Sequence, residues 1–263
     1  MSVDYDDLLY WIRHKFEKAE NFQERVPFNH IVVDNFLSEG IASELLSVIP
    51  STQRKAESMG KTARTKVHGY KKYTINPSLL DAEKRQLFDF FNSSQFLDML
   101  ESITGIKGLI GDAHFEGGGI HITFNEGSLN IHTDFSHNKR MRARRRLNLI
   151  IYMNPEWNVG WGGSLILTDF QRDDVKIAPA YNRAVLFETN ADSFHGHPEP
   201  LNMPADIGRK SIAFYYYDVP EEKQRNETAY KVSQYNPFFD KFRIIWIEKW
   251  RHLKNLRKFF KIR

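Results

Sequence analysis

The chain has 263 residues, of which 41% are hydrophobic and 14% aromatic, enough to build a substantial core in one large domain or two small ones. It contains no cysteine, which excludes disulfides, thiolate metal sites and cysteine nucleophiles, so a metal would need histidine and carboxylate ligands. The net charge of +4 is uneven: residues 236–263 hold nine Lys or Arg and two Asp or Glu, a net +7, so the remainder carries −3.

No stretch of about 18 apolar residues is present, so no membrane-spanning helix is expected. The first seven residues are acidic and lack an apolar signal core, which argues against export. The expected compartment is therefore the cytoplasm.

The first part of the chain has mainly helical patterns. Asp4–Lys18 repeats apolar residues at helical spacing, Phe28–Asp34 is typical of a strand, and Ser38–Leu46 follows as a helix with Ser38 at its N-cap. Residues Ser51–Tyr73 are polar and basic and predict a loop. A helical region from Ser78 to Thr104, broken near Asn92-Ser93, leads into the glycine-rich connection Gly105–Gly119.

From Ile120 onward, short β-rich runs alternate with turn signals, which predicts a sandwich or barrel. The expected strands are His121–Phe124, Leu129–Phe135, Leu147–Met153, Ser164–Thr168, Val175–Ala178, Arg183–Phe187 and Ser211–Asp218. Helices followed by strands predict an α+β chain with a mainly β core, in which N-terminal helices brace one sheet of a jelly roll. We expect one such domain over residues 1–235 and a separate C-terminal helix over residues 236–263.

The stretch Asn130-Ile-His-Thr-Asp-Phe135 holds a pair of metal-capable side chains. In an extended strand His132 and Asp134 point to the same side, because side chains alternate between faces. Such a pair supplies two of the three ligands of a 2-His-1-carboxylate site for non-haem iron. A third ligand is available in Phe194-His-Gly-His-Pro198, where both His195 and His197 are candidates.

A possible anion anchor follows in Gly208-Arg-Lys-Ser211. Arg209 and Ser211 share one face of their strand, and a buried arginine needs an anion to compensate its charge, such as the carboxylate of a dicarboxylic acid. Asn148, Ile150 and Tyr152 share a face of another strand, so the Tyr152 hydroxyl could join Arg209 on the same carboxylate.

The order of these motifs resembles that of the Fe(II)/2-oxoglutarate dioxygenases, in particular the prolyl-4-hydroxylase-like group, over roughly residues 28–219. The motifs are His132-x-Asp134, Leu147–Trp157, Gly162-Gly-Ser-Leu165, Ser193-Phe-His195-Gly and Arg209-x-Ser211. The resemblance implies a double-stranded β-helix fold. It also implies Fe(II) as metal, with 2-oxoglutarate and O2 as cosubstrates.

The resemblance also implies roles for particular residues. His132, Asp134 and His195 correspond to the iron ligands. Arg209 corresponds to the anchor of the distal 2-oxoglutarate carboxylate, assisted by Ser211, Tyr152 and Asn148, with Leu165 as an apolar wall. His197 lies outside the match and stays a reserve ligand or a neighbour of the metal. The tyrosine that the family carries early in its first core strand is replaced, and His121 or Thr123 occupies that region.

The expected reaction is hydroxylation of an unactivated C–H bond, coupled to decarboxylation of 2-oxoglutarate to succinate and CO2. The fold does not select the substrate. An acidic sugar or glycan, another small metabolite and a peptidyl proline are all compatible with the sequence. A metal-free binding module and a zinc hydrolase with the same three ligands are the alternatives from other classes.

Two basic segments suggest anionic partners. Lys139–Arg146 carries six positive charges in eight residues, and we expect it beside the metal opening, where it would hold an anionic substrate; it shows no aromatic interleaving, so nucleic acid is a minor interpretation. Residues 236–263 repeat Trp, Phe, Ile and Leu at helical spacing with a basic opposite side. That helix either packs on the barrel or lies peripherally on an anionic membrane surface.

Overall fold

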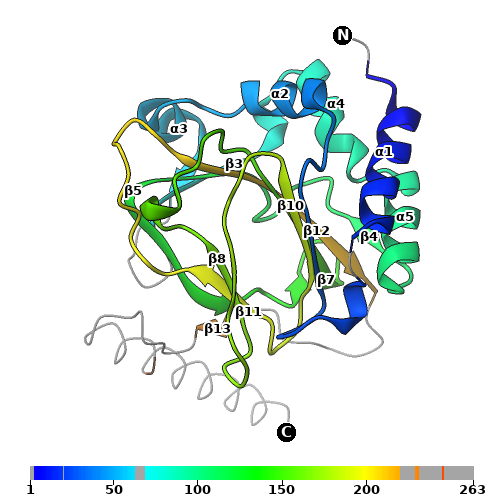
Figure 1. The fold of residues 1–263 in the computed structure, drawn as a ribbon. Coiled ribbons are helices and arrows are strands. Elements are labelled where there is room, and N and C mark those ends of the chain that lie inside the picture. The colour runs from blue at the N-terminus through cyan, green and yellow to red at the C-terminus, as the bar shows by residue number, and fades with distance from the viewer. Residues whose placement is uncertain (1–2, 20, 63–68, 220–228, 231–244, 246–263) are drawn as a thin grey trace, which may run out of the picture.

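The strands form one curled sheet whose two halves face each other, as the computed structural model shows in Figure 1. Residues 3–19, 21–62, 69–219, 229–230 and 245 are described. The larger half has the order β1 (His30–Val33), β10 (Arg183–Glu188), β7 (Ala143–Tyr152), β12 (Arg209–Asp218), β5 (Gly119–Thr133), β3 (Tyr70–Ile75) and β2 (Lys61–Thr62).

The smaller half starts from the second part of β5, which belongs to both halves. It continues with β11 (Phe194–His197), β8 (Leu165–Thr168) and β9 (Val175–Ile177). Three short strands complete the sheet: β4 (Ile110–Gly111) beside β12, β6 (His137–Asn138) beside β7, and β13 (Ala229–Tyr230) beside β5. This mainly β, jelly-roll-like architecture confirms the predicted fold class.

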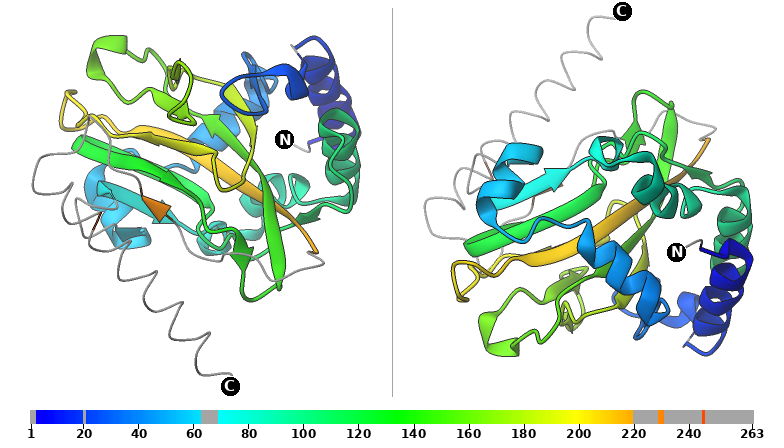
Figure 2. Two further views of the ribbon diagram at one scale, coloured as in Figure 1. Left: turned by 90° about the horizontal axis from the view of Figure 1, so that it is seen from below. Right: turned by 90° about the horizontal axis from the view of Figure 1, so that it is seen from above.

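Helices cover the outer face of the larger half (Figure 2). They are α1 (Tyr5–Glu17), α2 (Glu39–Ser47), α3 (Gln53–Met59), α4 (Ala82–Phe90) and α5 (Ser94–Thr104), with 3-10 turns at Phe22–Glu24, Pro77–Leu79 and Val159–Trp161.

The aromatic residues of β12 show how the helices attach. The ring of Phe214 lies 6.0 Å from that of Phe88 and 4.5 Å from that of Phe91, measured between centroids, and Tyr216 stacks near Phe96. Because side chains alternate along a strand, the intervening residue Tyr215 points to the opposite, inner side of the sheet. The aromatic contacts with the helices therefore leave the inner face available for a site.

The predicted helix break near Asn92-Ser93 is present. Ser93 caps α5, since its hydroxyl accepts the Phe96 N–H at 3.3 Å, and this local bond starts a new helix in place of continuing α4. No helix in the described part of the chain is long and apolar enough to cross a membrane.

Two expected strands, His121–Phe124 and Leu129–Phe135, are one bent strand, β5. Tyr70 and Lys72 of β3 face Ser128 and Thr123, so β5 has extra residues at this point. Glu126 has a positive φ of 63°, and a Cβ on Gly127 would lie 2.8 Å from the Tyr70 oxygen. The turn signals in this segment therefore mark a bulge within a strand rather than its end.

The expectation of a loop over Ser51–Tyr73 is wrong for the described residues. The segment contains α3, whose first turn is capped by the Thr52 hydroxyl, followed by β2 and the start of β3. The glycine-rich connection Gly105–Gly119 also contains a strand, β4. Polar composition hid these elements, because their apolar residues are few. The expected C-terminal helix over residues 236–263 lies outside the described part, apart from residue 245.

Candidate metal centre

Three side chains meet where β5 and β11 pair. His195 lies directly opposite His132 in the antiparallel register, and Asp134 follows β5 immediately. One ligand atom from each of His132, Asp134 and His195 lies within 4.8 Å of the others, and within the described residues this is the group that could hold a metal. The curl of the sheet thus brings Asp134 close to His195, which is 61 positions later in the sequence.

Backbone carbonyls set the orientation of both imidazoles. Nδ1 of His132 lies 2.7 Å from the Asn130 oxygen, and Nδ1 of His195 lies 3.2 Å from the Ser193 oxygen. A carbonyl only accepts, so each Nδ1 carries a proton; when the ring is neutral, its Nε2 carries the lone pair that a metal can bind. Both Nε2 atoms face Asp134, at 3.7 Å from Oδ1 for His132 and 3.3 Å from Oδ2 for His195. This tautomer is the one that metal-binding histidines use.

The carboxylate of Asp134 is held by two further residues. Arg145 Nη2 lies 2.9 Å from Oδ2, and the Asn148 amide donates to the same oxygen at 2.8 Å. Burial alone would raise the pKa of Asp134, but Arg145 and the two imidazoles outweigh burial and hold this pKa well below its usual range. The group is therefore ionised and ready to bind a cation. The Asn148 oxygen accepts from Arg145 Nε at 2.8 Å, which fixes the direction of the Asn148 side chain. Its amide nitrogen therefore points at Asp134 and orients the Asp134 carboxylate.

A β-bulge turns Arg145 into the site. Leu147 of β7 pairs with Tyr216, but Arg145 pairs with Tyr217, so Arg146 is an extra residue. Strict alternation from Asn148 would place Arg146 and Arg144 inside and Arg145 outside. The extra residue reverses that pattern. Arg145 is consequently 2% exposed, with its guanidinium 3.3 Å from the centre of the Tyr215 ring.

These residues border a cavity of about 280 Å³ between the two halves of the sheet. Every residue that the sequence assigned to cosubstrate binding lines it: Asn148, Tyr152, Leu165, Arg209 and Ser211. The cavity is also lined by Arg145, from the basic run that the sequence placed beside the metal opening, and by residues that the sequence did not single out for the site, among them Lys72, Thr74 and Tyr215.

Arg209 is 5% exposed. Its Nε donates to the Gly163 oxygen at 2.7 Å, and its Nη2 donates to the Tyr152 hydroxyl at 3.3 Å. Gly163 has a φ of +71°, and a Cβ there would meet Leu201 at 2.6 Å and the Arg209 side chain at 3.1 Å, so only glycine fits. The glycine motif before Leu165 thus fixes the direction of this guanidinium.

His197 and His121 also line the cavity. His197 is outside the metal group: it pairs with Leu129 after a register shift, and both of its ring nitrogens are buried without a hydrogen-bond partner in the described chain. Burial, with Arg209 and Lys72 nearby, holds the pKa of His197 well below its ordinary value. His121 bonds the Gly117 oxygen at 3.0 Å, and burial followed by Lys72 lowers its pKa in the same way.

Lys72 is a cation that sequence analysis placed in a loop. It pairs with Thr123 of β5, which in turn pairs with Arg209 of β12, so the three lie in one row across the sheet. Burial, opposed by Asp134 and supported by Arg209 and Arg145, lowers the pKa of Lys72 to about 8. The Lys72 ammonium makes no hydrogen bond or ion pair with the described residues, which exposes its charge to the contents of the cavity.

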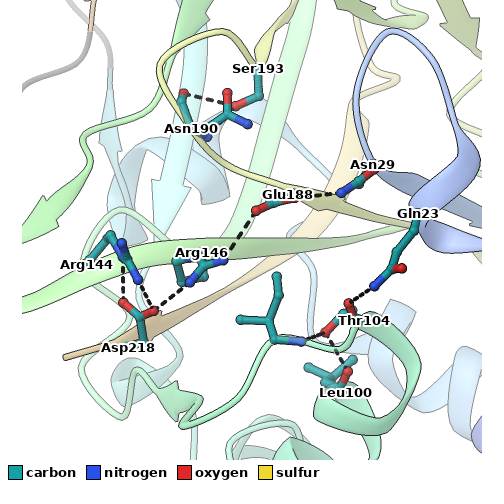
Figure 3. A network of polar contacts seen from close by, with 11 residues as sticks. Gln23, Asn29, Leu100, Thr104, Arg144, Arg146, Glu188, Asn190, Ser193 and Asp218 are labelled. Atoms are coloured by element: carbon teal, nitrogen blue, oxygen red, sulfur yellow. Dashed lines mark hydrogen bonds and ion pairs between the residues drawn. The ribbon is translucent and has the colours of Figure 1, made fainter. Parts of the chain in front are cut away.

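The basic run Lys139–Arg146, expected beside the metal opening, reaches the site only in part. Arg144, Arg145 and Arg146 are part of β7. Asp218 accepts from Arg144 Nε at 2.8 Å and from Arg146 Nη1 at 2.7 Å, and Arg146 also reaches Glu188 at 3.3 Å (Figure 3). Only Arg145 of these three enters the cavity, whereas Lys139, Arg140 and Arg142 are exposed.

Comparisons with known proteins give a family match and a fold similarity. Residues 119–217 match a family model described as the 2OG-Fe(II) oxygenase superfamily. The fold is similar to a prolyl 4-hydroxylase from Phytophthora capsici, with a TM-score of 0.53, 19% identity, and coverage of 93% of this chain and 77% of that one. A Pseudomonas putida prolyl-4-hydroxylase gives a TM-score of 0.53 at 15% identity, covering 80% of this chain and 98% of that one. No curated protein sequence matches.

Proposed function

The chain belongs to the 2OG-Fe(II) oxygenase superfamily, and on that premise we propose that it hydroxylates an unactivated C–H bond of a small, acidic metabolite such as a sugar acid or acidic glycan. As a member, it is an oxygenase that uses Fe(II), 2-oxoglutarate and O2.

The observation that carries the proposal is the donor set. Two imidazole Nε2 atoms and one ionised carboxylate face one point, a set that fits octahedral Fe(II) and leaves positions for a cosubstrate and O2. When bound, iron supplies the site at which O2 is reduced while 2-oxoglutarate is oxidatively decarboxylated to succinate and CO2. We assign His132, Asp134 and His195 as the ligands.

The remaining residues of the cavity bind and orient. Arg209, held by Gly163 and Tyr152, is assigned to the distal carboxylate of 2-oxoglutarate, with Ser211 beside it and Leu165 as an apolar wall. Arg145 and Asn148 keep the Asp134 carboxylate in one orientation, so the metal geometry is set before binding. The buried walls limit the access of water to the reacting C–H bond.

The test is succinate release with Fe(II) and 2-oxoglutarate across libraries of sugar acids, other metabolites and peptides. We expect turnover that requires both Fe(II) and 2-oxoglutarate and is stimulated by acidic sugars. Stimulation by proline-containing peptides alone would favour peptidyl-prolyl hydroxylation, the second candidate, which the fold similarity to prolyl 4-hydroxylases supports. Failure to bind 2-oxoglutarate would contradict the oxygenase assignment and favour a zinc hydrolase.

A further inference from the structure

The charges that line the cavity do not balance. Lys72, Arg145 and Arg209 are positive, and Asp134 is the one carboxylate among the described lining residues, so two positive charges are in excess. Fe(II) adds two positive charges and 2-oxoglutarate two negative ones, which leaves this excess unchanged. Buried cations without anions are costly, so the excess points to a further anion in the complete complex.

Two of the three cations have unused hydrogen-bonding capacity in the cavity. Arg145 Nη1 is buried and has no hydrogen-bond partner in the described chain, although the neighbouring Nη2 contacts Asp134. Lys72 has no ion pair or hydrogen bond there either, and its ammonium lies within electrostatic range of Asp134, Arg209 and Arg145, of which Asp134 acts on it most strongly. Arg209 differs, because Gly163 and Tyr152 already direct it.

The position of Lys72 in the chain separates it from the cosubstrate machinery. The superfamily match covers residues 119–217, which include Arg209 and the three candidate metal ligands. Lys72 lies outside that match, on a strand added at the edge of β5. A cosubstrate common to a superfamily is expected to be bound by its common part, so a cation outside that part is available to the individual substrate.

We propose that Lys72 and Arg145 form a subsite for an anionic group, a carboxylate or a phosphate, of the primary substrate. The proposal rests on the oxygenase function above and names the feature of the substrate that the site recognises. Arg145 offers a planar fork and Lys72 a point charge, and together they would orient the anion relative to the metal. Arg145 belongs to the basic run Lys139–Arg146, to which the sequence assigned an anionic substrate, so the subsite narrows that assignment to one residue of the run and adds Lys72.

The test uses inorganic sulfate as the minimal anionic probe, titrated calorimetrically into the full chain loaded with Mn(II) and 2-oxoglutarate, which does not turn over. Lys72→Met should weaken sulfate binding at least tenfold and change the affinity for 2-oxoglutarate less than threefold. Lys72→Arg should retain sulfate binding. The matched control is Lys71→Met, on the same strand, because the Lys71 ammonium is paired with Glu126 at 2.6 Å outside the cavity.

Three results would overturn the proposal. Unchanged sulfate affinity in Lys72→Met would contradict the subsite. A loss of sulfate affinity in Lys71→Met as large as that in Lys72→Met would show that the effect comes from general surface charge. A loss of 2-oxoglutarate affinity as large as the loss for sulfate would move Lys72 to the cosubstrate site. A wild-type chain that fails to bind 2-oxoglutarate would instead contradict the proposed function itself, and the subsite would lose its premise.

Discussion

The guanidinium of Arg209 is buried and directed by two fixed acceptors, so its charge is available to one anion in a defined place. Arg209→Ala should weaken 2-oxoglutarate binding by about 3–5 kcal/mol, because one partner of a buried charge pair is removed. The measurement is calorimetric titration of 2-oxoglutarate into the Mn(II)-loaded protein.

Arg183 provides the matched control for Arg209. It is another arginine of the curled sheet, but its guanidinium is paired with Asp34 and is not among the residues that line the cavity. Arg183→Ala should leave 2-oxoglutarate affinity within threefold of the wild type. The assignment of Arg209 would be wrong if the two variants lost affinity equally.

Asp134 supports the fold as well as the metal. In the metal-free protein it is the carboxylate that compensates Arg145, which is almost fully buried. Asp134→Ala should abolish metal binding and also lower the free energy of unfolding by about 3 kcal/mol, because a buried cation loses its partner. Urea denaturation of the metal-free protein measures this.

The double variant Asp134→Ala/Arg145→Met separates the two effects. It should regain most of the lost stability without regaining metal affinity, because the buried charge is removed together with its partner. Equal stability of the single and double variants would contradict the proposed coupling between Asp134 and Arg145.

The pKa of Lys72, lowered to about 8 chiefly by burial, gives the anion subsite a pH dependence. The ammonium is charged below this pKa and neutral above it, so sulfate affinity should fall as the pH rises through about 8. Arg145 keeps its charge over this range, and Asp134 stays ionised. Calorimetric titrations from about pH 7 to about pH 9.5 should show this fall in the wild type and a flat profile in Lys72→Arg.

The residues that could be found from sequence share one property: each lies in a motif whose spacing has a direct geometric meaning. His132 and Asp134 are two apart, Arg209 and Ser211 are two apart, and all four line or border the same cavity. Arg145 and Lys72 have no such spacing. Arg145 lies in a run with five other basic residues, so the sequence does not distinguish it from them. Its inward direction depends on a bulge that is defined by the pairing of β7 with β12.

The bulge in β7 is therefore itself testable. Inserting one alanine between Arg146 and Leu147, with the bulge kept, should shift Arg145 by one pairing position along β12, turn it outward and weaken Mn(II) binding at least tenfold, because Asp134 loses its buried partner. Arg146→Ala is the control, since it keeps the bulge and removes only the partly exposed contacts to Asp218 and Glu188, at a cost of roughly 1 kcal/mol or less. Similar metal affinity in both variants would show that the inward direction of Arg145 does not determine the site.

The strand β3 shows why an element at a site is difficult to predict. Its core-facing residues Tyr73 and Ile75 alternate with Lys72 and Thr74, which line the cavity. In a strand with one face in the core and one in solvent, polar residues mark the solvent side. In β3 one face packs on the core and the other lines a polar cavity. The polar residues on the cavity side give the segment the polar composition of a loop. Pairing with β5, rather than local pattern, makes this segment a strand.

The charge of the molecule is divided between its parts. Residues 236–263 carry +7 and the rest of the chain −3. β13, which precedes this tail in the sequence, pairs with His132 and Thr133 of β5. The apolar helical pattern expected in the tail is compatible with packing against the domain and with binding to an anionic membrane surface.

Truncation after Tyr235 tests the two alternatives. If the apolar face of the expected helix packs on the domain, truncation should lower the free energy of unfolding. Neither the full chain nor the truncated one should then co-sediment with vesicles. The competing interpretation is a peripheral anchor, since each Lys or Arg near an anionic membrane gives about 1 kcal/mol. It predicts unchanged stability after truncation, with binding of the full chain to anionic but not to neutral vesicles. Sedimentation of the full chain with anionic vesicles at low salt, lost on truncation and at high salt, would contradict the packed arrangement.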